Sequence, residues 1–483
     1  MTPQSTPPAA LETLEIDGLT ADSRRVAEGF LFAALPGSRA DGRAYIGEAL
    51  ARGASAVLAP EGTTLEAAGR PVALLTAENP RRALAEMAAA FYKHQPREIA
   101  AITGTNGKTS VAVYTQQIWQ ALGLEAASLG TLGLLPARDY APAALTTPDP
   151  VELQACLARL AADGVDHLAM EASSHGLDQY RLHGVRVTAA AFTNLSHDHL
   201  DYHHDMESYL AAKARLFTEI LQPGGTAVLN ADIPEFESLR GQAAARGLTV
   251  WSYGRAGKEL RLVGAEPKHD GLDCRFDLFG QPHDFSLSMA GRFQAMNVLA
   301  ALGLAVACGA ELQKTIASLP SLSGVPGRME RIGETPAGGQ VIVDYAHTPN
   351  ALETVLEAAR AHTPGKLWVI VGCGGDRDRA KRPLMGGIAQ RLADRAIVTD
   401  DNPRSENPAA IRAEMLAAAP NAEEIGDRGE AIRRGVAALG PGDSLVIAGK
   451  GHETGQTVGG TVFPFDDRDV ARAAIQSLEG GRR

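Results

Sequence analysis

The sequence predicts an α/β protein built from three domains, and three observations support this fold class. The chain of 483 residues is too long for one ordinary hydrophobic core. Short apolar runs alternate with helix-like patterns through most of the chain, which is typical of parallel sheets covered by helices. A Gly- and Pro-rich stretch at residues 323–339 is typical of a domain boundary, and we place the domains at residues 1–97, 98–331 and 332–483.

The first domain is predicted to be a small α/β unit. Apolar runs predict its strands at residues 31–35, 55–59 and 72–75, and helical patterns cover residues 45–52 and 80–92. Two of its loops combine hydroxyl groups with arginines, around Ser23 and around Ser38 and Arg39. Taken alone, these loops are interpreted as solvated turns; a site for an anionic ligand is the alternative.

A glycine-bracketed loop opens the central domain. The run Gly-Thr-Asn-Gly-Lys-Thr-Ser at residues 104–110 follows an apolar strand pattern and precedes a helix predicted over residues 111–122. Backbone N–H groups, a helix N-terminus and Lys108 favour phosphate there, and the Thr109 hydroxyl can reach Mg²⁺. Ile102 stands where the strict Walker pattern requires its first Gly. We therefore interpret the loop as an ATP site of a variant kind.

The central domain is predicted to be a P-loop-type domain with a mainly parallel sheet and helices on both faces. Its further strands are expected at residues 168–171, 187–193, 225–230 and 248–253, with a last long helix at 294–308. Glu171 ends one of these strands, and ligands bind at strand C-termini in such sheets.

Six His or Asp residues occupy eight positions at residues 197–204, directly after another predicted strand. A polar surface loop is the simpler interpretation; a metal site is the alternative. Mg²⁺ prefers oxygen ligands, so one His with Glu171 and nucleotide oxygens suits it, whereas several His ligands would indicate a zinc hydrolase. His197, His203 and His204 are expected at the surface. Lys213, in a helix predicted over residues 206–221, has by itself the ordinary interpretation of a solvated lysine.

The last domain is predicted to be doubly wound and Rossmann-like. Apolar strand runs at residues 341–343, 366–372, 396–399 and 444–448 alternate with helices at 350–361, 382–392, 408–418 and 428–439. Polar or Gly-rich turns follow all four strands, beginning at Asp344, Gly372, Asp401 and Gly449. Because the carboxyl ends of parallel strands share one edge, these turns predict a ligand-binding edge.

Composition and charge exclude several classes of protein. The formal net charge of −11 argues against non-specific nucleic-acid binding, which needs a basic surface. The four cysteines form no C-x-x-C pair, so neither a disulfide framework nor a cysteine zinc site is expected. The longest apolar run has the length of a buried helix rather than of a membrane span. We expect a cytoplasmic protein, a monomer, that acts on small molecules.

Five of these motifs together resemble the Mur ligase family over nearly the whole chain. They lie at residues 104–110, 170–176, 198–201, 344–349 and 401–404. The missing first Gly of the phosphate loop is a feature of that family. The Asp-Asn-Pro-Arg run at 401–404 is typical of the members that add meso-diaminopimelate.

The resemblance implies an ATP-dependent acid–amino-acid ligase of peptidoglycan precursor synthesis that forms ADP and phosphate. Its substrates would be ATP, UDP-MurNAc-L-Ala-D-Glu and meso-diaminopimelate, its cofactor Mg²⁺, and its intermediate an acyl phosphate on the D-Glu side chain. An L-lysine-adding relative or a folylpolyglutamate-synthase-like enzyme is the alternative. A P-loop ATPase without ligation and a zinc hydrolase are more distant ones.

The resemblance also implies roles for individual residues. Lys108, Glu171, His199 and Lys213 would be catalytic, with Thr109, Glu171, His199 and Lys213 addressing Mg²⁺ and Lys213 carbamylated. The ATP contacts would be Gly104, Thr105, Asn106, Gly107, Lys108, Thr109, Ser110, Asn297, Arg328, Asp344 and His347. The UDP-MurNAc-dipeptide contacts would be Ser23, Ser38, Arg39, Ala40, Thr146, Thr147, Ser173, Gln179 and Arg181. The diaminopimelate contacts would be Arg377, Asp401, Asn402, Pro403, Arg404, Gly449 and Glu453.

Overall fold

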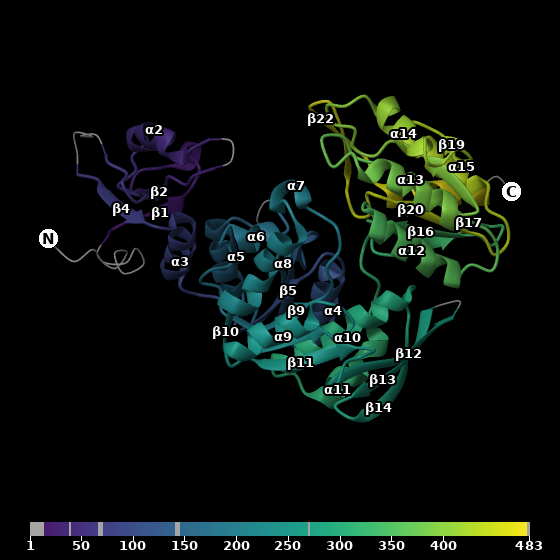
Figure 1. Ribbon diagram of the computed structural model, residues 1–483, viewed down its shortest axis with the longest axis horizontal. Coiled ribbons are helices and arrows are strands. Elements are labelled where there is room, and N and C mark those ends of the chain that lie inside the picture. The colour runs from purple at the N-terminus through teal and green to yellow at the C-terminus, as the bar shows by residue number, and fades with distance from the viewer. Residues whose placement is uncertain (1–13, 38–39, 66–70, 141–144, 269–270, 481–483) are drawn as a thin grey trace.

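Three main sheets organise the computed structural model, which describes residues 14–37, 40–65, 71–140, 145–268 and 271–480. Figure 1 shows an N-terminal and a C-terminal lobe on either side of a larger central one. The N-terminal lobe has a four-stranded parallel sheet in the order β1-β2-β3-β4. These strands are Gly18–Thr20, Phe30–Ala33, Ala56–Pro60 and Ala73–Ala77. The lobe also carries α2 (Ile46–Ala51) and α3 (Pro80–Tyr92).

Helix α3 has the predicted bounds and connects the N-terminal lobe to the central one, where it packs against α5 (Pro150–Ala162; Figure 1). The helix predicted over residues 45–52 is shorter, because a 3₁₀ turn (Gly42–Tyr45) precedes α2. Asn79 caps α3: its side-chain oxygen accepts a hydrogen bond from the backbone N–H of Arg82 at 3.1 Å.

Replacing this cap by Asn79→Ala should lower the free energy of unfolding by about 1 kcal/mol, because the first turn of α3 loses the acceptor for one of its N–H groups. The change can be measured by urea denaturation. The neighbouring, exposed Glu78 makes no cap bond, so Glu78→Ala is the matched control. An equal loss in both variants would contradict the capping role.

The central sheet has ten strands, in the order β14-β13-β12-β11-β10-β9-β5-β8-β6-β7. The strands are Glu98–Thr103 (β5), Ala126–Gly130 (β6), Gly133–Leu135 (β7), His167–Glu171 (β8), Val187–Phe192 (β9), Leu221–Asn230 (β10), Thr249–Gly254 (β11), Leu260–Lys268 (β12), Gly271–Leu278 (β13) and Gln281–Leu287 (β14). Strands β12, β13 and β14 form an antiparallel extension, and β7 is antiparallel to β6. Neither feature was predicted, because the alternation of strands and helices in the sequence indicates parallel strands only.

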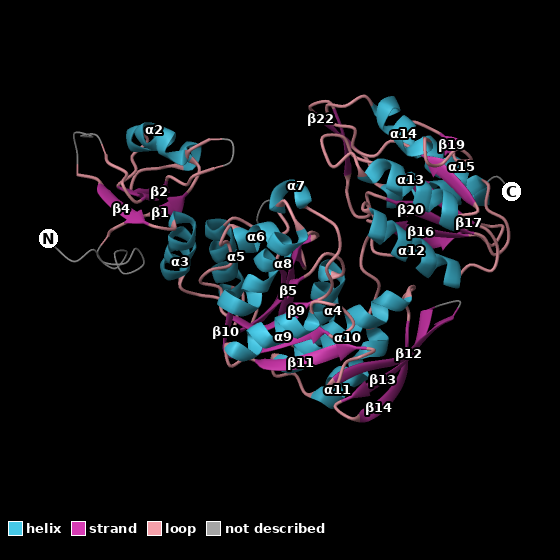
Figure 2. Cartoon of the chain, viewed as in Figure 1, coloured by secondary structure: helices cyan, strands magenta, loops and turns pink. Residues whose placement is uncertain are grey.

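Helices cover both faces of this sheet (Figure 2). They are α4 (Lys108–Ala121), α5, α6 (Ser174–Asp178), α7 (Leu200–His203), α8 (Met206–Arg215), α9 (Phe236–Ala245), α10 (Arg292–Ala307) and α11 (Leu312–Ser318). One buried cluster contains Trp119 and the α10 side chains, and a second contains Leu157 and Phe217 on the opposite face. The single helix predicted over residues 206–221 ends at Arg215, and a π-helical turn (Leu216–Ile220) follows it.

The C-terminal sheet has the order β15-β16-β20-β17-β18-β19, parallel except for β15. Its strands are Glu330–Glu334 (β15), Gln340–Asp344 (β16), Leu367–Val371 (β17), Arg395–Val398 (β18), Glu423–Glu424 (β19) and Ser444–Ala448 (β20). The helices are Pro349–Ala361 (α12), Lys381–Leu392 (α13), Pro408–Leu416 (α14), Arg428–Ala437 (α15) and Asp467–Gly480 (α16). Strand β20 lies between β16 and β17, so the chain reverses its winding direction there, which is where such sheets bind ligands.

Two features of the C-terminal lobe were not predicted from the sequence. Strand β15 begins at Glu330, two residues before the predicted boundary, because Glu330 already pairs with Val343 of β16. A hairpin of β21 (Gly455–Val458) and β22 (Thr461–Pro464), which the sequence analysis did not predict, follows β20. The division at residues 97 and 331 stays a prediction.

Within the described residues, no helix is long and apolar enough to cross a membrane.

Candidate active site

The phosphate loop connects β5 to α4, and two of its glycines are required by its shape. Gly104 and Gly107 have positive φ angles of 134° and 88°. A Cβ atom on Gly104 would lie 2.0 Å from the Thr193 hydroxyl, and one on Gly107 would lie 2.6 Å from the side-chain oxygen of Asn297. No side chain in the described part of the chain caps α4, so its first N–H groups remain available for an anion.

A buried and a partly buried lysine donate to the same carbonyl oxygen of this loop. The Nζ atoms of Lys108 and Lys213 lie 2.9 and 2.8 Å from the Gly104 oxygen, and Lys108 also donates to Thr105. Burial lowers the pKa of Lys213 well below its usual value, and the charge of Lys108 lowers it further. Burial lowers the pKa of Lys108 as well. Lys213 is 1% exposed, so the interpretation of it as a solvated lysine is wrong.

Glu171 ends β8 and is nearly completely buried. One carboxylate oxygen accepts hydrogen bonds from the Thr109 hydroxyl at 2.9 Å and from the Thr131 backbone N–H at 2.8 Å. The Thr131 hydroxyl donates to the other oxygen at 3.2 Å. Arg328 donates to the Thr109 hydroxyl at 3.1 Å, which links the segment before β15 to α4. The sequence analysis missed Thr131, although it follows β6 at the carboxyl edge of the sheet.

The His-rich segment is partly buried rather than a plain surface loop. The His199 side chain is 47% exposed, but desolvation by the protein on its other side lowers its pKa to about 4, so the ring is neutral at pH 7 and can offer a nitrogen lone pair. His203 is 5% exposed and packs against Tyr209, so the expectation that it lies at the surface is wrong. Among the described residues, no group of three or more His, Cys, Asp or Glu side chains is placed to hold a metal ion.

A cavity of about 530 Å³ brings most of the predicted nucleotide and catalytic residues together. Asp344 orders the cavity wall that the C-terminal lobe contributes. Its carboxylate accepts hydrogen bonds from the backbone N–H groups of Met329 and Ala346, both at 2.7 Å. The Arg328 guanidinium lies 4.4 Å from the centre of the Tyr345 ring. The predicted residues that line the cavity are Thr105, Asn106, Gly107, Lys108, Thr109, Ser110, Thr146, Glu171, Ser173, His199, Lys213, Asn297, Arg328, Asp344 and His347.

The predicted dipeptide contacts fall into two groups. Arg181 donates to the carbonyl oxygen of Thr147 and to the side chain of Gln179, both at 2.7 Å, next to Thr146 and Ser173 at the cavity wall. In the N-terminal lobe, the Ser23 hydroxyl is buried and donates to Glu48 at 2.9 Å. Ala40 is exposed, and Ser38 and Arg39 lie outside the described residues. Of the predicted contacts in the N-terminal lobe that the structure describes, Ser23 and Ala40, neither lines the cavity.

Most of the predicted diaminopimelate contacts form a second cluster at the carboxyl edge of the C-terminal sheet. Asn402 donates to Glu453 at 3.0 Å, and the buried Nζ of Lys450 contacts both, at 3.1 and 2.9 Å. A Cβ on Gly449, whose φ is 118°, would lie 2.8 Å from the Asp401 carboxylate. Sequence reasoning missed Lys450, whose importance depends on its burial between these polar groups.

Arg404 belongs to this second cluster, and its guanidinium forms no ion pair with an acidic side chain among the described residues. One guanidinium nitrogen donates to the Gly375 carbonyl oxygen at 2.7 Å, and the group makes no other hydrogen bond or ion pair in the described part of the chain. Arg377 lies exposed on the turn after Gly375, with no hydrogen bond to the other predicted contacts. An unpaired guanidinium beside a carboxylate–ammonium network can bind a substrate carboxylate.

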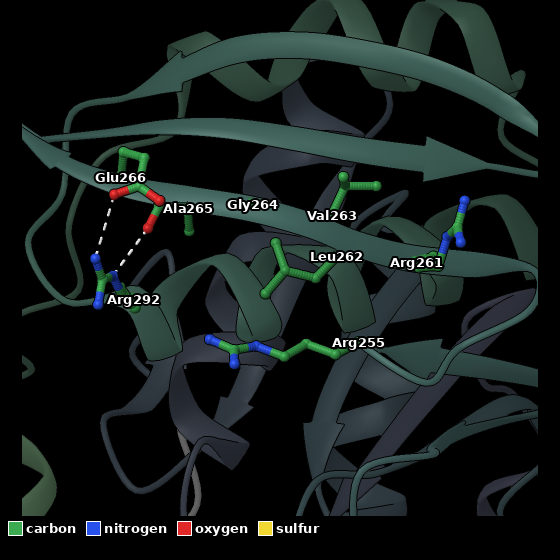
Figure 3. A pocket seen from close by; sticks show the side chains of 8 residues that line it. All are labelled: Arg255, Arg261, Leu262, Val263, Gly264, Ala265, Glu266 and Arg292. Carbon is green, nitrogen blue, oxygen red and sulfur yellow. Dashed lines mark hydrogen bonds and ion pairs between the residues drawn. The ribbon is translucent and has the colours of Figure 1, made fainter.

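Another hollow of similar volume lies along β12, outside both clusters (Figure 3). Arg255, Arg261 and Arg292 line it. Two of these charges are already paired: Arg261 with Asp277 at 2.6 Å and Arg292 with Glu266 at 3.3 Å. It shares no lining residue with the cavity at the phosphate loop.

Comparisons with known proteins identify the family of this chain. Models of the Mur ligase family match residues 15–92 (catalytic domain), 102–305 (middle domain) and 327–451 (glutamate ligase domain). The UDP-N-acetylmuramoyl-L-alanyl-D-glutamate–2,6-diaminopimelate ligase of Caulobacter vibrioides is 54% identical over 96% of both chains. The chain belongs to the Mur ligase family. The motifs that suggested this membership are thus part of a likeness that extends over nearly the whole chain.

Solved structures agree with the predicted fold class of this Mur ligase. A UDP-N-acetylmuramoyl-L-alanyl-D-glutamate–2,6-diaminopimelate ligase superposes with a TM-score of 0.70 at 34% identity, covering 96% of this chain and 95% of the other. A MurF ligase from Thermotoga maritima, solved with ADP, has a TM-score of 0.62 at 20% identity, covers 95% of this chain and 96% of its own, and shares the fold. The predicted arrangement of three α/β units is confirmed.

Proposed function

We propose that this Mur ligase joins meso-diaminopimelate to UDP-MurNAc-L-Ala-D-Glu and converts ATP into ADP and phosphate. The observation that carries the proposal is the unpaired guanidinium of Arg404 beside Asn402, Glu453 and Lys450. Relatives about 50% identical over about 96% of this chain bear the name of the corresponding ligase. The geometry of the phosphate loop supports ATP as the energy source.

A carboxylate is a poor acyl donor, so the D-Glu side chain must first receive the γ-phosphoryl group of ATP. The N–H groups at the start of α4 would bind the phosphates, and Lys108 would neutralise charge on the transferring group. Arg328, held by Thr109 and Tyr345, would add a second cation at the opposite wall. The amine of diaminopimelate would then attack the acyl phosphate, and phosphate would leave.

The residues present fit the Mg²⁺ that this chemistry requires. Thr109 and Glu171 supply a hydroxyl and a carboxylate, the oxygen ligands that Mg²⁺ prefers, and the neutral ring of His199 adds a nitrogen. When bound, Mg²⁺ would neutralise the negative charge of the phosphates. Lys213 is unsuited as an ammonium group, but its neutral amine could attack CO₂ and release one N–H proton to solvent, which leaves a carbamate with carboxylate oxygens. We therefore propose Thr109, Glu171, His199 and carbamylated Lys213 as the residues that address Mg²⁺.

The variant Glu171→Gln should raise the Mg²⁺ concentration needed for half-maximal ADP formation about five- to tenfold, because the amide keeps the hydrogen bond from Thr109 but loses the charge. The variant can be titrated with MgCl₂ at saturating substrates. Glu125→Gln, outside the cavity, is the control. An unchanged Mg²⁺ requirement would exclude Glu171 from the metal site.

Diaminopimelate differs from lysine by a second carboxylate on the carbon that bears the distal ammonium. The Arg404 guanidinium can bind that carboxylate through two nitrogens, and Glu453 can meet the ammonium. Lysine would leave the guanidinium unpaired. We propose Arg377, Asp401, Asn402, Pro403, Arg404, Gly449 and Glu453 as the amino-acid site, and Ser23, Ser38, Arg39 and Ala40 as part of a uridine-nucleotide site in the N-terminal lobe.

One assay tests the proposal: ADP release with UDP-MurNAc-L-Ala-D-Glu and either meso-diaminopimelate or L-lysine. We expect release that depends on diaminopimelate and is far slower with lysine. Dependence on lysine alone would make the enzyme the L-lysine-adding relative. Release without any amine would indicate an ATPase that does not ligate.

A further inference from the structure

The backbone of Arg404 has an unusual conformation that its neighbours maintain. Its φ angle is 51°, in the left-handed region that residues other than glycine rarely adopt. Its backbone N–H donates to the Thr457 carbonyl at 3.0 Å, and its carbonyl accepts from the Gly459 N–H at 2.7 Å. Both partners belong to the β21–β22 hairpin, so this hairpin holds Arg404 in its conformation.

The guanidinium of Arg404 is aimed by a second loop, residues 374–376. In the described part of the chain, the guanidinium makes one hydrogen bond, which it donates to the carbonyl oxygen of Gly375. The Gly375 N–H in turn donates to the Asn402 carbonyl at 2.9 Å, and Asp376 accepts hydrogen bonds from the backbone and hydroxyl of Ser405 at 3.1 and 2.6 Å. The position of this loop therefore sets the direction of the guanidinium.

A fully buried arginine on α13 joins the two loops. The Arg382 side chain is 0% exposed, and two of its nitrogens donate to the two carboxylate oxygens of Glu406 at 3.0 and 2.8 Å. Glu406 follows the Arg404 turn and accepts the Asp376 N–H at 2.7 Å. Arg382 also donates to the Gly374 carbonyl at 3.4 Å and to Glu414 of α14 at 3.1 Å. The Arg382 hydrogen bonds lower the pKa of Glu406 to about 2, so this link stays charged at neutral pH.

We infer that Arg382 is a positioning residue for amino-acid selection: by clamping Glu406 and Gly374, it fixes the loop that aims Arg404 at the distal carboxylate of the substrate. The inference rests on the proposed function, because it assumes that Arg404 binds this carboxylate. Arg382 does not contact the substrate itself. Its loss would allow residues 374–376 to shift, and a guanidinium displaced by about an ångström loses much of a bidentate contact.

The test is a double-mutant cycle with Arg382→Met, Arg404→Lys and the double variant, followed by ADP release at varied diaminopimelate and varied ATP. We expect Arg382→Met to raise the KM for diaminopimelate about tenfold, with the KM for ATP within about twofold of wild type. In the Arg404→Lys background, the same change should have little further effect. Arg391→Met is the matched control, since Arg391 lies on the same helix and pairs with Glu353 at the surface.

If the fold-increases in the KM for diaminopimelate caused by Arg382→Met and Arg404→Lys simply multiplied in the double variant, the inference would be overturned. Equal increases in the KM values for diaminopimelate and ATP in Arg382→Met would also overturn it. Either result would leave only a structural role for Arg382. If Arg382→Met does not fold, Glu406→Gln provides the same comparison, because it weakens the link to the loop while Arg382 keeps Glu414. An unchanged KM for diaminopimelate in Glu406→Gln would also overturn it. A wild-type enzyme without diaminopimelate-dependent ADP release would instead refute the proposed function, so the two failures are distinguishable.

Discussion

The variant Lys213→Ala should lose ligase activity by at least about a hundredfold. In the folded protein, the Nζ atoms of Lys213 and Lys108 share the Gly104 carbonyl oxygen, an arrangement that two positive charges disfavour. A carbamate on Lys213 would replace one of these cations by an anion and supply oxygen ligands for Mg²⁺. The lowered pKa of Lys213 favours this modification, because a larger fraction of the amine is then neutral and can attack CO₂. ADP release under saturating substrates measures the loss.

Short carboxylates such as formate or acetate should restore part of the activity of Lys213→Ala, because the truncated side chain leaves room for a carboxylate where the carbamate would lie. Lys314→Ala is the control: that side chain is 71% exposed and forms a surface ion pair with Glu311. It should keep wild-type activity and show no response to formate. If no carboxylate concentration restores Lys213→Ala, carbamylation is not the reason why Lys213 is needed.

The variant Arg404→Lys should raise the KM for meso-diaminopimelate about 30- to 100-fold, which corresponds to the loss of one charge-assisted hydrogen bond. An ammonium keeps the charge but cannot present two parallel N–H groups to a carboxylate. The KM for ATP should change little, because Arg404 does not line the cavity at the phosphate loop. Initial rates at varied diaminopimelate and at varied ATP measure the two values.

The preference for diaminopimelate over L-lysine should also shrink in Arg404→Lys, because lysine lacks the carboxylate that the guanidinium binds. Arg395→Lys, at the exposed start of β18, is the matched control and should change neither KM. Equal losses toward diaminopimelate and ATP would show that Arg404 acts on the whole site rather than on one substrate.

Much of the fold could be predicted because its signals are local. The helix of residues 80–92 has an Asn cap, a Pro at its first position and a periodic apolar face, and the structure has these bounds. The buried strands β17 and β20 are short continuous apolar runs, and their ends were predicted within one residue. The antiparallel β12–β14 extension was missed, because its strands follow one another without a helix between them and β12 contains Gly264 and Pro267.

The family, the phosphate loop and the order of polar turns could be derived from the sequence alone, because each depends on residue types at short spacing. The roles of the buried charges, in contrast, depend on contacts that exist only in the folded chain. Lys213 donates to a carbonyl 109 residues away, and Lys450 contacts Asn402 across 48 residues. Arg382 reaches Glu406 and Glu414 on separate segments. Whether a charged side chain is solvated or clamped depends on which distant segments surround it, because the cost of desolvation and its compensation by a partner arise only in the folded chain.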